Sequence, residues 1–190
     1  SMQHLDAYGQ AAAKQRVLED AFWHIARIRP MEIYPAIYGT GWGYRSRARL
    51  SVRLVPKKGG ILVGFHEKRS SYIADMDTCE VLPPSVSALL SPLRKLIGAL
   101  SLPNRLPQIE VAIGDSLTVL VLRILQPLTP ADETLLRDFA ERHGIQFWLQ
   151  PGGPESAHPF HPCDAPPLSY VLPDFGLRLQ FRPSEFTQVN

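Results

Sequence analysis

The sequence contains only two cysteines, Cys79 and Cys163, among its 190 residues. Two cysteines do not build the disulfide framework of a small secreted domain. The sequence has no Cys-x-x-Cys pair and no paired Cys/His spacing, so it closes no metal site by itself. His158 and His161 are spaced like metal ligands, but no third ligand accompanies them in this proline-rich stretch. We therefore interpret their spacing as chance.

The sequence also lacks any long apolar run. No stretch is long enough to cross a membrane, and residues 1–10 do not contain the apolar segment of a signal peptide. These features predict a soluble, cytoplasmic protein with no membrane partner, and no feature indicates an obligate protein partner. The length suits one large or two small domains, and 45% hydrophobic residues are enough for a packed core.

Acidic residues are nearly absent from residues 44–69. This region holds eight Lys or Arg and one acid, Glu67, which gives a net charge of +7. The remaining residues hold 12 basic and 17 acidic side chains, a net charge of −5. Because the positive charge is concentrated in one hairpin-sized region of a mildly acidic chain, the sequence favours an anionic partner.

Arginines in this region alternate with other residues from Gly43 to Val55. At the period of a β-strand, one face carries Arg45, Arg47, Arg49, Ser51 and Arg53, and the other carries Tyr44, Ser46, Ala48, Leu50, Val52 and Leu54. Like charges at alternate positions repel, so such a row is typical of a surface that binds a polyanion. The alternative is a strand whose arginines pair with acids elsewhere in the fold, such as Asp75 or Asp77. The strand alone does not decide between the two.

The remaining patterns predict an α+β fold with antiparallel sheets and flanking helices. Helices are expected at 5–29, 86–100 and 129–143, and strands at 44–55, 61–65, 72–74, 108–113, 117–125, 145–149, 170–172 and 177–181. Pro56 to Gly60 indicates the turn of a hairpin over 44–65. Thr129 and Gly144 suit the start and end of the third helix. Residues 151–167 contain six prolines and are expected to form a loop.

Several stretches carry a family resemblance through their order and spacing. They are Gly43 to Leu50, Gly64 to Ser71, Asp75 to Cys79, and Gly176 to Asn190, together with the opening Met2-Gln3-His4. In this order they resemble the RNA uracil-5-methyltransferases, and most closely the members that act on 23S ribosomal RNA. The resemblance spans nearly the whole chain.

The resemblance implies a domain organisation. Family members begin with a small β-barrel RNA-binding (TRAM) domain, continue with three clustered cysteines and the region seen here, and end with a Rossmann-like methyltransferase domain. Residues 1–182 would then be the central RNA-recognition and iron–sulfur-associated domain, with candidate sub-units 1–102 and 103–182. Residues 183–190 would open the methyltransferase domain.

The resemblance also assigns candidate site residues. The matching RNA-binding positions are Arg45, Arg47, Arg49, Arg53, Phe65, His66, Lys68 and Arg69. Many relatives have Arg in place of His66, which leaves the role of that position open, and we expect Arg47 or Arg49 to be partly structural. Phe186 matches the target-base pocket and Gln188 the S-adenosylmethionine site. The family's catalytic cysteine and glutamate have no counterpart, so no catalytic residue is assigned.

Cys79 matches the fourth ligand of a [4Fe-4S] cluster in the family. Such a cluster is held by four thiolates, so we expect neither the cluster nor S-adenosylmethionine to be bound to this chain alone.

These features predict the central substrate-recognition domain of an S-adenosylmethionine-dependent 23S rRNA uracil-5-methyltransferase, with ribosomal RNA as its partner. The parent would be an enzyme and this chain alone inactive. A self-contained, non-enzymatic RNA-binding module explains the basic hairpin equally well. A protein-interaction domain with an acidic partner is a third hypothesis, which salt-dependent binding to ribosomal RNA would distinguish from the other two.

Overall fold

The computed structural model describes residue 2 and residues 4–188. The expectations that fall on Gln3, Val189 and Asn190 lie outside the described residues. The helices are α1 (Ala7–Asp20), α2 (Pro84–Ser87), α3 (Leu90–Ala99) and α4 (Pro130–His143). The strands are β1 (Arg47–Val55), β2 (Gly60–Gly64), β3 (Gln108–Ile113), β4 (Thr118–Arg123), β5 (Gln146–Gln150), β6 (His158–His161), β7 (Leu168–Leu172) and β8 (Leu177–Phe181).

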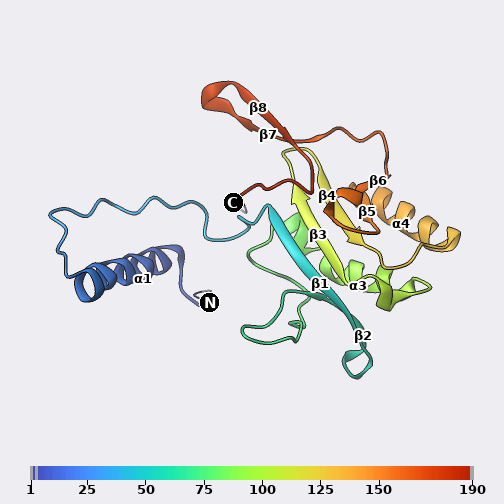
Figure 1. The fold of residues 1–190 in the computed structure, drawn as a ribbon, viewed down its shortest axis with the longest axis horizontal. Coiled ribbons are helices and arrows are strands. Elements are labelled where there is room, and N and C mark those ends of the chain that lie inside the picture. The colour runs from blue at the N-terminus through green and yellow to red at the C-terminus, as the bar shows by residue number, and fades with distance from the viewer. Residues whose placement is uncertain (1, 3, 189–190) are drawn as a thin grey trace.

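Six strands form one mixed sheet in the order β2-β1-β3-β4-β5-β6, and β7 and β8 form a separate hairpin (Figure 1). The α+β class is confirmed. The sheet is antiparallel except for the β4–β5 pair, which is parallel because α4 carries the chain back across the sheet. The candidate sub-units 1–102 and 103–182 share this sheet, since β1 pairs with β3.

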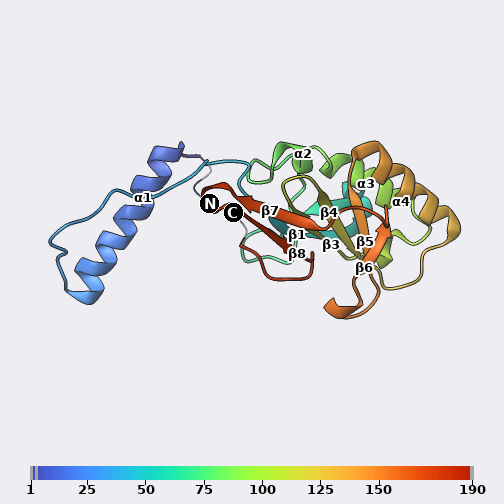
Figure 2. The ribbon, with the colours of Figure 1, turned by 90° about the horizontal axis from the view of Figure 1, so that it is seen from above.

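The core lies between one face of the sheet and the helices. Figure 2 shows α2, α3 and α4 along the same side of the sheet. Leu50 of β1 and Ile97 of α3 are fully buried there, and Leu136 of α4 belongs to the same cluster. The predicted apolar face of β1 is therefore confirmed for Ala48, Leu50 and Val52.

Leu54 departs from this prediction, because it is 42% exposed. It lies beyond the part of β1 that pairs with β3, which ends at Ser51. At Leu54 the strand pairs only with β2, since β3 no longer continues alongside it.

The predicted helix over 129–143 has both of its expected ends. Thr129 and Asp132 form a reciprocal capping box, and Gly144 closes the helix at a φ of 62°. Asp132 also accepts hydrogen bonds from the backbone N–H and the hydroxyl of Ser101, at 2.8 and 2.5 Å. Burial alone would raise the pKa of Asp132, but the hydrogen bonds from Ser101 and Thr129 outweigh it and lower this pKa to about 2.

Three predictions about secondary structure need correction. Residues 151–167 are not only a loop, because β6 (His158–His161) pairs with β5. Pro159 is tolerated there because β6 is an edge strand, where one side of the ladder needs no N–H donor. The strand expected over 72–74 is reduced to a single bridge between Ile73 and His66. The predicted helix 86–100 is divided into α2 and α3.

The predicted helix 5–29 stands away from the sheet. Its regular part ends at Asp20, a π-helical turn continues to Ala26, and Arg27 leaves the helix at a φ of 58°. Figure 1 shows α1 and the extended segment after it projecting from the body of the molecule. The expected apolar stripe does not face a core, since Leu18 is 55% and Ile25 is 83% exposed. Among the described residues, no helix is both long and apolar enough to span a membrane.

Candidate nucleic-acid interface

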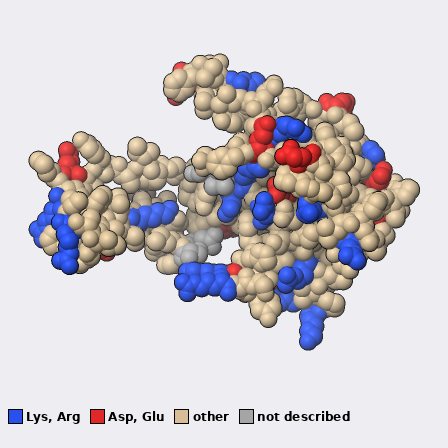
Figure 3. Space-filling model, viewed as in Figure 1, with Lys and Arg blue, Asp and Glu red and all other residues tan. Residues whose placement is uncertain are grey.

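The outer face of β1 carries the predicted row of arginines. Side chains alternate across a strand, so burial of Ala48, Leu50 and Val52 turns Arg47, Arg49, Ser51 and Arg53 to the face opposite the helices. Arg49 and Arg53 are exposed. Figure 3 shows Lys and Arg side chains over the β1–β2 part of the molecule, with a group of acidic side chains next to them. The sheet thus presents these cations from a rigid frame.

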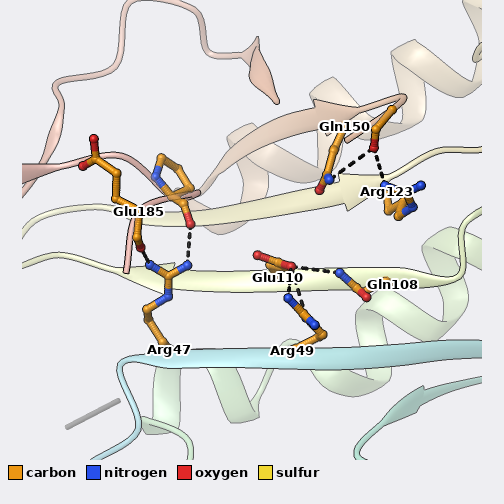
Figure 4. A network of polar contacts seen from close by, with 9 residues as sticks. Arg47, Arg49, Gln108, Glu110, Arg123, Gln150 and Glu185 are labelled. Carbon is orange, nitrogen blue, oxygen red and sulfur yellow. Dashed lines mark hydrogen bonds and ion pairs between the residues drawn. The ribbon is translucent and has the colours of Figure 1, made fainter. Parts of the chain in front are cut away.

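Arg49 has an acidic neighbour on the next strand. Its guanidinium lies 2.9 Å from Oε1 of Glu110, which sits opposite it in the β1–β3 register (Figure 4). Gln108 donates a second hydrogen bond to the same oxygen at 2.9 Å. The side chain of Arg49 is still 70% exposed, so its outer surface can meet an anion from solvent.

Arg53 and His66 border an open groove of about 360 Å³ at the far end of β1. Arg53 donates to the carbonyl of Ser71 at 3.2 Å, and Nε2 of His66 is hydrogen-bonded to the hydroxyl of Ser51 at 2.9 Å. Asn104 adds a polar side chain to the lining of the same groove. These groups offer donors and acceptors to a ligand that lies along the strand.

Arg45, Phe65, Lys68 and Arg69 lie on the neighbouring segments. The guanidinium of Arg45 lies 5.1 Å from the ring centre of half-buried Phe65, so this ring already makes a cation–π contact within the protein. Lys68 and Arg69 are exposed in the turn after β2, and Arg69 adopts a left-handed φ of 57°. The basic turn therefore points its charges into solvent next to β1.

Arg47 differs from the other arginines of β1 because it makes several hydrogen bonds to one segment that is distant in sequence. It donates to the carbonyl of Pro183 at 2.6 Å, to the carbonyl of Glu185, and to the hydroxyl of Thr187 at 3.3 Å (Figure 4). Burial is the largest influence on its guanidinium and lowers the pKa of Arg47. The expectation that Arg47 or Arg49 is partly structural fits Arg47 best.

The acids proposed as alternative partners of the arginine row have another partner. Asp75 and Asp77 both pair with Arg94 of α3, at 3.0 and 3.2 Å. Within the described residues, the acid that pairs with the outer face of β1 is instead Glu110. The sequence contained a signal for it, since Glu110 occupies an outward position at period two in the predicted strand 108–113.

Cys79 lies in the connector that Arg94 holds to α3. It is half-buried against the core, and its backbone N–H donates to the hydroxyl of Ser87 at 2.8 Å. No group of three His, Cys, Asp or Glu side chains within the described part of the chain is arranged to hold a metal ion. One thiol does not fit a cluster that needs four thiolates, so the described residues alone do not form that site.

The segment with Phe186 and Gln188 runs beside β1. The hydroxyl of Ser46 donates to the carbonyl of Gln188 at 3.4 Å, and Arg47 holds the residues before it. The side chain of Phe186 is 86% exposed. The structure thus brings the two residues matched to the base and cofactor sites next to the arginine row.

The similarity to known proteins covers the whole chain. The chain aligns over all 190 residues with a 23S rRNA (uracil(1939)-C(5))-methyltransferase RlmD from Aromatoleum aromaticum, and 63% of the aligned residues are identical. The aligned part makes up 44% of that relative. The identity over the same 190 residues is 60% with the RlmD protein of Cupriavidus necator and 62% with that of Nitrosospira multiformis, and the chain covers 43% of each of them. A scan against protein-family models finds no match. The chain spans less than half the length of these relatives, and over all 190 residues its sequence is similar to the RlmD-type RNA uracil-5-methyltransferases.

Proposed function

We propose that the chain is the central, substrate-recognition part of an S-adenosylmethionine-dependent methyltransferase that acts on a uracil of 23S ribosomal RNA. The single observation that carries the proposal is the outward row of β1, where exposed Arg49 and Arg53 project from a strand whose other face is locked into the core. Arginine binds phosphate oxygens with two parallel hydrogen bonds, so a fixed row of them suits a folded RNA backbone.

The division of labour follows from the groups the chain offers. The RNA backbone is bound by Arg49, Arg53, Lys68 and Arg69. The groove beside His66 accepts part of the RNA chain. Methylation of a ring carbon requires the base to leave its stack, and in this proposal exposed Phe186 and the side-chain amide of Gln188 contact the extruded base. The rest of the parent supplies the nucleophile and most of the S-adenosylmethionine site. This substrate implies a cytoplasmic location.

Cys79 contributes one thiolate to a [4Fe-4S] cluster of the parent in this proposal. Its backbone is fixed by Ser87, and Arg94 ties the preceding acids to α3, which gives the thiol a defined position at the surface of the core. The other three ligands come from outside the described residues.

A chimera tests the proposed function. The matching segment of the Aromatoleum aromaticum relative is replaced by this chain, and transfer of a labelled methyl group from S-adenosylmethionine to 23S rRNA is measured. We expect activity within about tenfold of the relative, since 63% of the segment is identical, and mass spectrometry should find the methyl group on uracil. A folded chimera that binds its cofactors but methylates no uracil would contradict the proposal.

A further inference from the structure

The segment from Arg182 to Gln188 is ordered without belonging to a helix or a strand. A local turn begins it: the N–H of Glu185 donates to the carbonyl of Arg182 at 3.0 Å, and the Glu185 carboxylate accepts from the N–H of Arg182 at 2.8 Å. Pro183 is buried. The hydrogen bonds close the turn on itself, and the guanidinium of Arg182, 5.9 Å from the ring centre of Trp148 in β5, places the start of the segment against the sheet.

Arg47 connects the rest of the segment to the sheet. Its two terminal nitrogens reach the carbonyls of Pro183 and Glu185, and one of them also reaches the hydroxyl of Thr187. A planar guanidinium suits this task because its donors diverge in a fixed plane and can hold several acceptors at once. The acceptors lie 136 to 140 residues away in sequence, so the contact ties two distant parts of the chain.

Ser46, the residue immediately before Arg47, adds a second tie. The hydroxyl of Ser46 donates to the carbonyl of Gln188, directly beside the Arg47 contacts. Ser46 itself is fixed to the sheet, because its carbonyl accepts from the N–H of Ile113 at 3.0 Å. Phe186 is 86% exposed, so the backbone of this segment largely sets where its ring lies.

We infer that Arg47 is a positioning residue, which holds residues 183–188 against β1 and thereby sets where Phe186 and Gln188 lie relative to the RNA-binding arginines. Arg47 is thus separated in role from Arg49, two positions along the same strand, which binds RNA directly. The inference rests on the proposed function for its consequence in catalysis. The tether itself is a property of this chain.

The tether can be measured on the 190-residue chain without RNA. Backbone ¹⁵N relaxation gives the order parameter S² of residues 184–188, and we expect values near 0.8 in the wild type and below about 0.6 in Arg47→Gln. Arg49→Gln is the matched control, because it removes a guanidinium from the same face without touching this segment, and it should leave S² unchanged. Equal S² in the wild type and Arg47→Gln would overturn the inference.

The catalytic consequence is measured in the active chimera. For Arg47→Gln we expect kcat at saturating RNA to fall about tenfold or more with KM changed less than threefold, because the pocket residues are misplaced while RNA still binds. For Arg49→Gln we expect the opposite, a raised KM with kcat nearly kept. Arg47→Lys should recover part of kcat, since an ammonium reaches only some of the carbonyls. A raised KM with unchanged kcat in Arg47→Gln would overturn the positioning role.

The outcomes separate the two proposals. A folded wild-type chimera that binds its cofactors but methylates no uracil contradicts the proposed function, and the S² measurement then decides the tether alone. A mobile 184–188 segment in Arg47→Gln combined with unchanged kcat contradicts the positioning role while the tether itself stands.

Discussion

Glu110 limits how much of the charge of Arg49 is available to a ligand. The pair is joined at 2.9 Å but lies at the surface, where such pairs contribute roughly 0–1 kcal/mol to stability. We expect Glu110→Gln to change the free energy of unfolding by less than about 1 kcal/mol and to tighten RNA binding several-fold, because Arg49 loses its competing anion. Filter binding at several salt concentrations measures this, and the dependence on salt should steepen by up to about one unit of slope.

Glu133→Gln is the matched control for that variant. It also removes one negative charge and one surface ion pair, the 3.4 Å contact with Arg137, but on the helical side of the sheet. It should leave RNA affinity nearly unchanged. Equal tightening by both variants would mean that net charge, not the β1 surface, governs binding.

Asp132 makes stability depend on pH. Its pKa is about 2 in the folded chain against an ordinary value of 3.8, so the folded state favours the ionised form. The stabilisation is present above pH 3.8 and is lost as the pH falls from about 4 to about 2. A shift of this size corresponds to about 2 kcal/mol. We expect Asp132→Asn to lower the free energy of unfolding by that order at pH 7, measured by urea denaturation.

The comparison across pH is the sharper part of that experiment. The difference between the wild type and Asp132→Asn should be constant from pH 7 to 5 and shrink below pH 4. Asp138→Asn, an exposed position on the same helix, serves as the control and should show neither effect. A difference that persists unchanged at pH 3 would contradict the role assigned to ionised Asp132.

At the scale of elements, α1 is the part whose packing the sequence did not predict. Its period of apolar residues predicts a helix correctly, but amphipathic spacing does not say what covers the apolar face. None of the residues of α1 is buried. We expect removal of residues 1–38 to shift the melting temperature of the remaining chain by less than about 3 °C, because the removed part contributes little to the core. A drop well beyond that, seen by circular dichroism, would show that the helix packs on the sheet.

Strand β1 shows what sequence patterns can and cannot predict. Its alternation predicts which side faces the core, because the apolar side chains of Ala48, Leu50 and Val52 all lie on one face and are buried together. The pattern also predicts the outward arginines. It does not predict that Arg47 meets carbonyls of Pro183 and Glu185, since backbone acceptors carry no sequence signature. The partner of Arg49 depends on the pairing of β1 with β3, about 60 residues away, which a local pattern does not encode.

At the scale of the whole molecule, the fold gathers the cationic residues of one sequence region onto one surface. The region 44–69 carries a net charge of +7 within a chain of net charge +2. The hairpin of β1 and β2 and the turn after it place these cations on one part of the molecule, away from the helical face. A cationic surface of this kind fits the ribosomal RNA substrate that we propose.

The most direct test of the central claim is the salt dependence of binding to a 23S rRNA fragment that contains the uracil methylated by the relatives. The variant Arg49→Glu/Arg53→Glu is compared with Lys14→Glu/Lys95→Glu, which makes the same charge change on α1 and α3. We predict that the arginine variant weakens binding and lowers the slope of log Kd against log salt by about 1.5 to 2 units. The lysine variant should bind like the wild type. Equal losses in both variants, or no loss in the arginine variant, would contradict the claim that β1 binds RNA.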